Sequence, residues 1–287
     1  MPMFECVPNV SEGRDAAVLA ACADAIEATG AQLAHRTSDT VHNRSVFTFF
    51  GTREIVVAAA VALAKVTTTH VDLRLQRGAH PRIGALDVLP FVPFGDATLR
   101  DAVAVAVESA RQIWDACGVP SVFYGYAAMS PQRRLLADVR AGEFEGLVAR
   151  GHRAGPPDVG NIDAHASAGA IAIGAREPLV AFNVVLGSGD LGLAREIART
   201  IRERSGGLRT LRTLGLRLDE ARVQISCNIT DPAATPLHRV FGLVRELAAQ
   251  RGVCVERSEL IGLIGRDALG AVAAHALGIE VLPTAAQ

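Results

Sequence analysis

The chain has 287 residues, of which 49% are hydrophobic and 21% are charged, and its formal net charge at pH 7 is -1. These values are typical of globular proteins, and no excess of basic residues favours a polynucleotide, so we expect no nucleic-acid partner. The longest hydrophobic stretch, residues 55–64, is far shorter than a membrane span, and the chain does not open with a basic stretch and an apolar core. We therefore expect no membrane partner and a cytoplasmic location.

Strand-like and helix-like patterns alternate along the first part of the chain. The predicted elements are a strand at 4–8, a helix at 16–29 that Gly30 ends, strands at 32–36 and 45–51, a helix capped by Thr52 and running to residue 66, and a strand at 71–74. This order, β-α-β-β-α-β, is the split βαβ arrangement of ferredoxin-like folds.

The same order of patterns occurs again after Pro178. It comprises a strand at 179–186, a helix at 191–204, strands at 210–218 and 222–229, a helix at 236–250 and a strand at 253–260. Between the two copies lie strands at 85–92 and 121–126, a helix at 99–117, and a stretch at 151–169 rich in Gly, Pro and Asp. We interpret that stretch as a linker or ligand loop. The sequence thus predicts an α+β fold with two subdomains, residues 1–177 and 178–287.

The run at 187–192, Gly-Ser-Gly-Asp-Leu-Gly, follows a predicted strand and opens a predicted helix, as a dinucleotide-binding loop does. No acidic residue ends a second strand about 20 residues further on, and the next elements have the pattern of a hairpin. We favour a tight turn in which Asp190 caps the helix, and a dinucleotide-dependent oxidoreductase is the weaker alternative.

His80 lies in the run Arg77-Gly78-Ala79-His80-Pro81-Arg82. Gly78 permits a tight turn and Pro81 disfavours helical geometry at His80, so we expect the imidazole on a loop. The flanking guanidinium groups disfavour a charged His80 and can hold carboxylates, which predicts acid/base chemistry on an anionic substrate. The alternative is a solvated loop histidine without a chemical role.

Two further segments carry polar or small residues. In the segment from Asp39 to Arg44, Asp39 could orient a histidine, and Asn43 and Arg44 could hold amides and carboxylates of a substrate; the alternative is a turn with a solvated arginine. The run at 158–169 offers backbone NH groups to a flat heterocycle. The eight histidines and five cysteines show no metal-ligand spacing, so we expect no metal site.

Several runs together resemble one family, the formiminotransferases, which occur alone or as the N-terminal part of formiminotransferase-cyclodeaminases. These runs are ECVPNVSEG at 5–13, HNRSVFTF at 42–49, HPRIGALDV at 80–88, VRAGEFE at 139–145, Gly-Ala at 169–170 with Gly-Ala-Arg at 174–176, AFN at 181–183 and SELIGL at 258–263. The resemblance extends over nearly the whole chain and implies two ferredoxin-like subdomains with a ligand cleft between them, usually in a homodimer.

The resemblance also implies a reaction, the transfer of a formimino group from N-formiminoglutamate to N5 of the co-substrate tetrahydrofolate. His80 would be the acid/base that removes the proton from N5. The loop at 160–169 would contact folate, through Gly160, Asn161, His165, Ser167 and Gly169. Arg44, Arg77 and Arg82 could hold glutamyl carboxylates. A separate formiminotetrahydrofolate cyclodeaminase would be a partner.

The chain departs from the family pattern at three positions. Members often carry Lys-Gly-Glu before the histidine, where this chain has Arg77-Gly78-Ala79. The acidic residue that orients the histidine aligns nearer Thr37 than Asp39, and Asn161 stands where proline often follows the glycine. The missing glutamate motivates a second hypothesis, a non-catalytic protein of the same fold that binds folate or a small acid.

Overall fold

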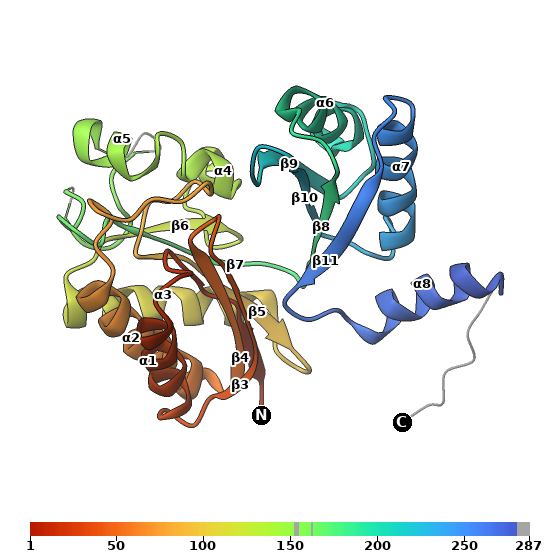
Figure 1. The fold of residues 1–287 in the computed structure, drawn as a ribbon. Helices are drawn as coiled ribbons and strands as arrows, with labels where there is room; N and C mark the ends of the chain where they lie inside the picture. Colours follow the sequence, from red (N-terminus) through yellow and green to blue (C-terminus); the bar gives the residue numbers. More distant parts are fainter. Residues whose placement is uncertain (152–154, 162, 280–287) are drawn as a thin grey trace. The chain divides into compact units, whose positions relative to one another are not determined.

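The computed structural model of the chain describes residues 1–151, 155–161 and 163–279. Two compact units, Met1–Glu177 and Pro178–Gln287, make up the chain, and each has its own sheet and its own hydrophobic core (Figure 1). Each unit combines helices with a largely antiparallel sheet, so the predicted α+β class is confirmed. No helix in the described part of the chain combines the length and hydrophobicity that crossing a membrane requires.

Unit 1 is built on a seven-stranded sheet. Its strands are β1 (Met3–Cys6), β2 (Asn9–Val10), β3 (Gln32–Asp39), β4 (Arg44–Gly51), β5 (Leu86–Phe94), β6 (Ser121–Gly125) and β7 (Ile171–Ala175). The strand order is β1-β4-β2-β5-β7-β6, with β3 paired to β4 and β1 also paired to β5. The pairs β5–β7 and β6–β7 are parallel and the others are antiparallel.

Three long helices pack on the unit 1 sheet, and two short ones follow β6. They are α1 (Ala16–Glu27), α2 (Arg53–His70), α3 (Leu99–Cys117), α4 (Leu136–Val139) and α5 (Glu143–Arg150), with a 3-10 turn at Pro131–Arg133. Figure 1 shows α1, α2 and α3 side by side on one face of the sheet. Their apolar residues pack with Phe4, Phe47, Phe49 and Phe91 of the strands, so this face of the sheet is part of the core.

The strand predicted at 71–74 is wrong, because these residues form a turn. The Asp72 carboxylate accepts hydrogen bonds from the backbone and the guanidinium of Arg74. Val71 and Leu73 are buried, as the alternating pattern indicated, but the backbone NH of Leu73 donates to Ser167 and not to a neighbouring strand. The strand that follows α2 is β5, and the intervening loop carries His80.

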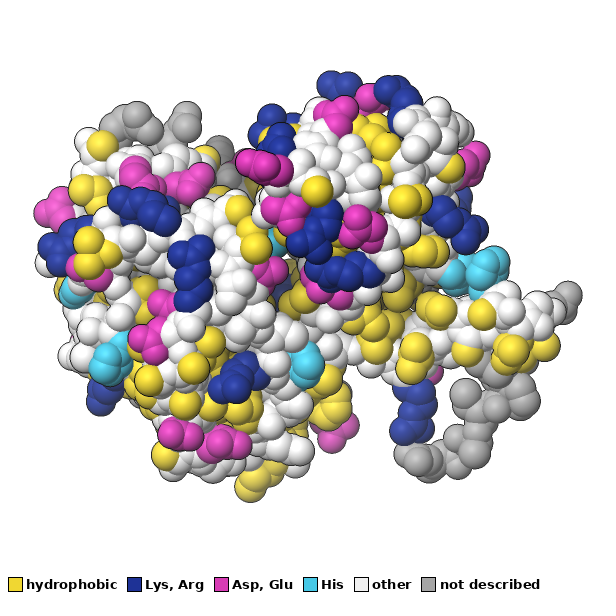
Figure 2. Space-filling model, in the orientation of Figure 1, with side chains coloured by type: hydrophobic (Ala, Val, Ile, Leu, Met, Phe, Trp, Pro, Cys, Tyr) yellow, Lys and Arg dark blue, Asp and Glu magenta, His cyan; other side chains and the backbone are white. Residues whose placement is uncertain are grey.

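Unit 2 has the order of elements that its sequence predicts. It contains β8 (Val180–Leu186), α6 (Leu191–Ile201), a 3-10 turn (Glu203–Ser205), β9 (Leu211–Arg217), β10 (Val223–Ile229), α7 (Leu237–Ala249), β11 (Val255–Ile261) and α8 (Arg266–Leu277). The sheet is antiparallel in the order β11-β8-β10-β9, and α6 and α7 cover its core. Helix α8 was not predicted. None of its residues is buried, and Figure 2 shows hydrophobic side chains along it, where Leu269 and Leu277 are 53% and 69% exposed.

The glycine-rich run at 187–192 is a tight turn before α6. Asp190 caps this helix by accepting a hydrogen bond from the backbone NH of Leu193 at 3.1 Å, as predicted. A Cβ atom added at Gly189 would lie 1.9 Å from the carbonyl oxygen of Glu220. The following strands β9 and β10 form an antiparallel pair, which is unlike the parallel continuation of a dinucleotide-binding fold. Glycine is therefore needed at position 189 because the backbone of Glu220 leaves no room for a side chain.

Gly189→Ala should lower the free energy of unfolding by about 1–3 kcal/mol, because the methyl group must displace the carbonyl of Glu220. Gly242→Ala is the matched control: Gly242 lies within α7, and nothing lies within 4 Å of an added Cβ atom. Alanine is favoured over glycine by about 0.5–1 kcal/mol in a helix, so this control should be slightly stabilised. Urea denaturation of both variants measures the difference. Equal stability of Gly189→Ala and the wild type would contradict the packing role.

Candidate active site

Three of the predicted polar segments meet at one end of the unit 1 sheet. Val10 of β2 pairs with Ser45 on one side and with Leu86 on the other, so the first residues of β4 and β5 lie near each other. An isolated bridge between Gly84 and Gly169 adds the turn that precedes β7. The segments at 39–44, 77–87 and 165–169 therefore surround one region, although they are far apart in the sequence.

His80 lies half-buried on the loop between α2 and β5. Its Nδ1 lies 2.9 Å from the carbonyl oxygen of Pro81. Because a carbonyl can only accept, this bond places the ring hydrogen on Nδ1 and leaves a lone pair on Nε2. Burial, together with the charges of Arg44 and Arg140, holds the pKa of His80 well below its ordinary value of 6.5. His80 is thus a neutral imidazole at physiological pH, with one nitrogen ready to accept a proton.

The charges beside His80 converge on Asp87, which is fully buried at the start of β5. One oxygen of its carboxylate accepts from Arg44 at 2.7 Å and from Arg140 at 2.5 Å. The other accepts from the backbone NH groups of Ile83 and Gly84 at 2.7 and 3.3 Å. Burial would raise the pKa of Asp87, but the two arginines and these hydrogen bonds hold it far below its usual range.

One carboxylate between two guanidinium groups leaves a buried cluster with a net charge of about one positive unit, if all three groups are ionised. Arg44 donates further hydrogen bonds to Asn9, at 2.7 and 3.0 Å. The buried Nε of Arg140 has no hydrogen-bond partner among the described residues. This surplus charge repels a proton from His80 and favours an anionic substrate nearby. We refer to Arg44, Asp87 and Arg140 as the Asp87 cluster.

Asp87 and Arg140 were not among the predicted site residues. Both lie in runs that carry the family resemblance, HPRIGALDV and VRAGEFE. A signal was present, because an aspartate within a strand of otherwise apolar residues is buried at high cost unless a cation pairs with it. The sequence could not indicate which of its many arginines is that cation.

Arg82 and Arg77 are in different environments, although both flank His80 in the sequence. Arg82 is buried, and its donors contact Glu145 at 2.9 and 3.0 Å, the side chain of Gln76 at 2.7 Å, and backbone carbonyls. It links the His80 loop to α5. Arg77 is exposed, and a single Arg77 nitrogen bonds to backbone carbonyls. Of these two arginines, Arg77 is the one whose donors can reach a ligand.

Asn43 stabilises the loop that carries His80 through hydrogen bonds. Its backbone is in the left-handed region, with φ of 48°, which asparagine tolerates better than most residues. Its side-chain oxygen accepts from the NH of Gly13 at 2.9 Å, and its amide donates to the carbonyl of Arg77 at 3.1 Å. Gln76 donates to the carbonyl of Asn43 at 3.0 Å. The side chain is therefore engaged within the protein.

Asp39 contacts a histidine, as its predicted role requires, and that histidine is His42. The carboxylate of Asp39 lies 2.9 Å from Nδ1 of His42 and accepts from the backbone NH groups of Val41 and His42, each at 2.8 Å. Burial opposes ionisation of Asp39, but these bonds lower its pKa to about 2. The ring of His42 is 6.1 Å from that of His80, centroid to centroid, in an edge-to-face arrangement. His42 was not among the predicted site residues, although it opens the run HNRSVFTF that carries the family resemblance.

The loop predicted to contact folate lies in two places. His165 accepts from the NH of Ala168 at 3.1 Å, and the carbonyl of Ser167 accepts from Leu73 at 2.9 Å. Gly169, with φ of 72°, packs so closely that an added Cβ atom would lie 2.0 Å from the carbonyl of Ile83. Gly169 therefore lies against the segment that leads from His80 into β5, Ser167 lies against the turn that follows α2, and His165 bonds within its own loop.

Gly160 and the exposed Asn161 follow a different part of the sheet. A Cβ atom at Gly160, where φ is 100°, would lie 2.7 Å from the ring of Trp114 at the end of α3. The preceding Val159 forms a bridge with Ser121, the first residue of β6. Since Ser121 also pairs with Ile171, this half of the loop lies at the same end of the sheet as the other half.

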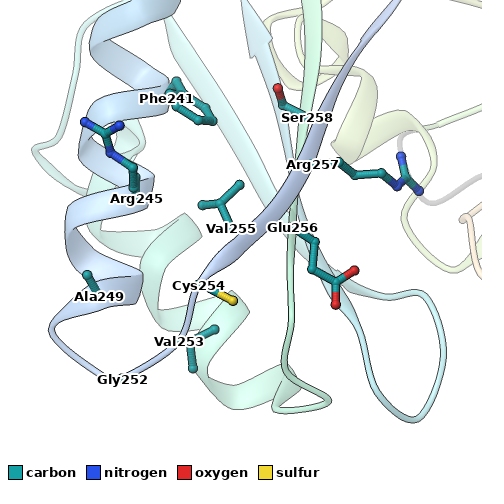
Figure 3. A pocket seen from close by; sticks show the side chains of 10 residues that line it. All are labelled: Phe241, Arg245, Ala249, Gly252, Val253, Cys254, Val255, Glu256, Arg257 and Ser258. Carbon is teal, nitrogen blue, oxygen red and sulfur yellow. The ribbon is translucent and has the colours of Figure 1, made fainter.

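Two further features do not include His80. Among the described residues, no group of three or more His, Cys, Asp or Glu side chains is placed to hold a metal ion. In unit 2, a cavity of about 600 Å³ lies between the second half of α7 and the start of β11 (Figure 3). It is lined by Phe241, Arg245, Ala249 and residues 252–258, and by none of the predicted site residues.

Comparison with known proteins adds the family. Residues 3–176 match the model of the formiminotransferase domain, N-terminal subdomain, and residues 181–282 match that of the formiminotransferase domain. The chain belongs to the formiminotransferase family. The resemblance found in the sequence is thereby confirmed, and the two matches fall within the two units of the structure.

Related proteins match this formiminotransferase over most of its length. It is 38% identical to a glutamate formimidoyltransferase of Streptococcus pyogenes serotype M1, over 97% of this chain and 94% of that protein. It is also 38% identical to a glutamate formimidoyltransferase of Thermoplasma acidophilum, over 98% of this chain and 94% of that protein. The formimidoyltransferase-cyclodeaminase of Rattus norvegicus is 36% identical over 93% of this chain, which spans 51% of that longer protein.

Asp87→Asn should lower the free energy of unfolding at pH 7 by about 3–5 kcal/mol, because two buried guanidinium groups lose their carboxylate. The folded state lowers the pKa of Asp87, so its carboxylate stabilises the wild type above the unfolded pKa of about 3.9, and this contribution is lost as the pH falls further. The difference between the two proteins should shrink below about pH 4. Denaturant titrations at several pH values measure it.

The control is Asp219→Asn, which removes a solvent-exposed pair with Arg222 and should change stability little. Equal stability of the Asp87 and Asp219 variants at pH 7 would contradict a structural role for the Asp87 cluster.

Proposed function

We propose that this formiminotransferase moves the formimino group of N-formiminoglutamate to N5 of tetrahydrofolate, releasing glutamate. Tetrahydrofolate is then a co-substrate. The observation that carries the proposal is His80, a neutral imidazole with Nε2 free to accept a proton, placed beside a buried positive cluster in a chain of this family.

Proton removal is the chemical need that His80 meets. When the N5 amine attacks the amidine carbon, N5 becomes positively charged and must lose its proton before the adduct can collapse forward. A neutral imidazole within hydrogen-bond reach of N5 accepts that proton, which contributes about 10²–10⁴-fold in rate. Holding both reactants in one site supplies acceleration through proximity.

The positive groups define where the carboxylates of the substrate bind. Arg77 has donors open to solvent, and we assign it to a glutamyl carboxylate, with the field of the Asp87 cluster adding to the attraction. Arg44, Arg82 and Asn43 act through the protein, because their side chains hold the His80 loop and its surroundings in place.

The folate-binding residues are assigned to the loop at one end of the sheet. Gly160, Asn161, His165, Ser167 and Gly169 are the residues that we propose to contact folate. The closeness of Gly169 to the segment at 83–85 supports this assignment. The order β8-α6-β9-β10-α7-β11 supports a ferredoxin-like fold for unit 2, and the order from β1 to β5 supports it for unit 1, where the first strand is divided into β1 and β2. A ligand cleft between such units remains a prediction of the family resemblance.

The partners follow from the chemistry. The product, 5-formiminotetrahydrofolate, is the substrate of a cyclodeaminase, and the name of the longer relative joins the two activities. We infer that a formiminotetrahydrofolate cyclodeaminase receives the product. A homodimer and a cytoplasmic location are the further expectations.

The test is an assay with N-formiminoglutamate and tetrahydrofolate, quenched in acid so that the product cyclises to methenyltetrahydrofolate, which is measured by absorbance. His80→Gln should lower kcat by about 100-fold or more. His70→Gln, at the exposed end of α2, is the control and should keep full activity. Because the pKa of His80 is lowered, the wild-type value of kcat/KM should persist as the pH falls below 6.5.

Two outcomes would contradict the proposal. Full activity in His80→Gln would remove the assigned base. A wild-type protein that binds tetrahydrofolate without turnover, with binding unchanged in His80→Ala, would favour the non-catalytic binding protein that the missing glutamate before His80 suggests.

A further inference from the structure

A second imidazole lies beside His80 and has an unused nitrogen. His42 is 7% exposed, and its Nδ1 is bound to Asp39 at 2.9 Å. Its other nitrogen, Nε2, is buried and has no hydrogen-bond partner among the residues that the structure describes. A buried polar atom without a partner is energetically costly. Such a cost is commonly accepted at a functional site, where the missing bond forms in another state of the protein.

The proposed transfer needs two proton movements, and His80 accounts for one of them. The N5 amine must lose a proton as it attacks. The nitrogen that leaves with glutamate must gain one, because an amide-like anion is a poor leaving group. A second titratable group beside the first would let both steps proceed on the same tetrahedral adduct.

The two histidines have different charged neighbours, as expected if one acts as a base and the other as an acid. His80 faces the surplus positive charge of the Asp87 cluster, which favours a neutral base. His42 faces the carboxylate of Asp39, so a proton on His42 is paired with a negative charge. One imidazole thus lies beside surplus positive charge and the other contacts a carboxylate, which are the surroundings expected of a base and of an acid.

The distance between the rings of His42 and His80 also suits two groups that act on the same substrate carbon. Hydrogen bonds of about 3 Å from each imidazole to two nitrogens on one carbon need rings several ångströms apart and not stacked. The observed centroid distance is 6.1 Å with 70° between the ring planes. The loop that carries His80 also packs closely against the backbone of His42, since a Cβ atom added at Gly78 would lie 2.0 Å from the carbonyl oxygen of His42. The two histidines are therefore held in a fixed relation.

We propose that His42 is the general acid of the transfer, donating a proton from Nε2 to the amine nitrogen that leaves with glutamate. This inference rests on the proposed function. The lone pair of N5 forms the new bond to the amidine carbon, while the π bond of the protonated C=N group breaks and its electron pair moves to the terminal nitrogen. The N5 proton then passes to Nε2 of His80. The bond from that carbon to the glutamate nitrogen breaks, its electron pair takes the proton of His42, and the lone pair of the terminal nitrogen re-forms the C=N bond on the product. One proton exchange with solvent at each histidine resets the site.

The charged and titratable groups near His42 in the described part of the chain come from its own turn and from two other segments. Asp39 lies on its own turn, and His80 and Arg77 lie on the loop that follows α2. Arg14 approaches the same turn, where its Nε donates to the carbonyl of Thr40 at 2.8 Å. Asp39 is the group in direct contact, so its removal should have the largest effect on the acid.

The test is the pH dependence of kcat for the wild type, His42→Gln and Asp39→Asn, measured with the assay above. The wild type should show an alkaline limb, as expected of a reaction that needs a protonated general acid. His42→Gln should lose that limb and about 100-fold in kcat, with the KM for tetrahydrofolate little changed. Asp39→Asn should keep the limb but move it to lower pH, because the paired charge is gone. His35→Gln, on β3, is the matched control and should match the wild type.

The outcomes separate this inference from the function on which it rests. Absence of turnover in the wild type would end the proposed function. If turnover depends on His80, the role of His42 is overturned by a wild-type profile without an alkaline limb, or by a limb that stays unchanged in both variants. Circular dichroism identifies a variant that fails to fold, and the profile of Asp39→Asn then decides alone.

Discussion

A single buried carboxylate organises the proposed active site. Asp87 opens β5, Arg44 opens β4, and Arg140 follows α4, so the two ion pairs join three segments separated by 43 and 53 positions in the sequence. The same carboxylate also accepts from the NH groups of Ile83 and Gly84, which end the His80 loop. The position and the protonation state of His80 both depend on this one group, because the cations that it gathers are those that disfavour a charged imidazole.

Stability and chemistry are coupled in this arrangement. Burying two guanidinium groups on one carboxylate leaves positive charge unbalanced, which is unfavourable for folding alone. The bonds of Arg44 to Asn9, and those of the Ile83 and Gly84 NH groups to Asp87, offset part of that cost. Separate hydrogen bonds from Asn43, Gln76 and Arg82 leave the His80 loop little freedom. A rigid base in a positive field needs little reorganisation when an anionic substrate binds, which is the advantage of a preorganised site.

Local signals in the sequence predicted much of the fold. Helix α3 has the predicted bounds, because Thr98 and Asp101 form a capping box and Gly118 ends the helix in the left-handed conformation. The order of elements in unit 2 was predicted for the same reason, since each element has its own periodicity and each turn its own glycine or aspartate. The strand at 71–74 was wrong because the alternation of Val71 and Leu73 describes burial, and a turn buries the same residues.

The site was harder to predict than the fold, because its contacts are long-range. Arg82 is adjacent to His80 in sequence but pairs with Glu145, 63 positions away, while Arg44 and Arg140 supply the charges next to His80. Asp39 was expected beside a histidine, and only the turn between β3 and β4 decides that it is His42. Spacing along a chain indicates which groups are available, and tertiary packing selects their partners.

The site as described requires that His80 is neutral and carries its proton on Nδ1. Nitrogen-15 NMR of the wild type, with the His80 signals assigned by comparison with His80→Gln, measures both the tautomer and the midpoint of titration. We expect the Nδ1–H tautomer and a midpoint well below 6.5. A midpoint at or above 6.5, or a proton on Nε2 of the neutral ring, would contradict it.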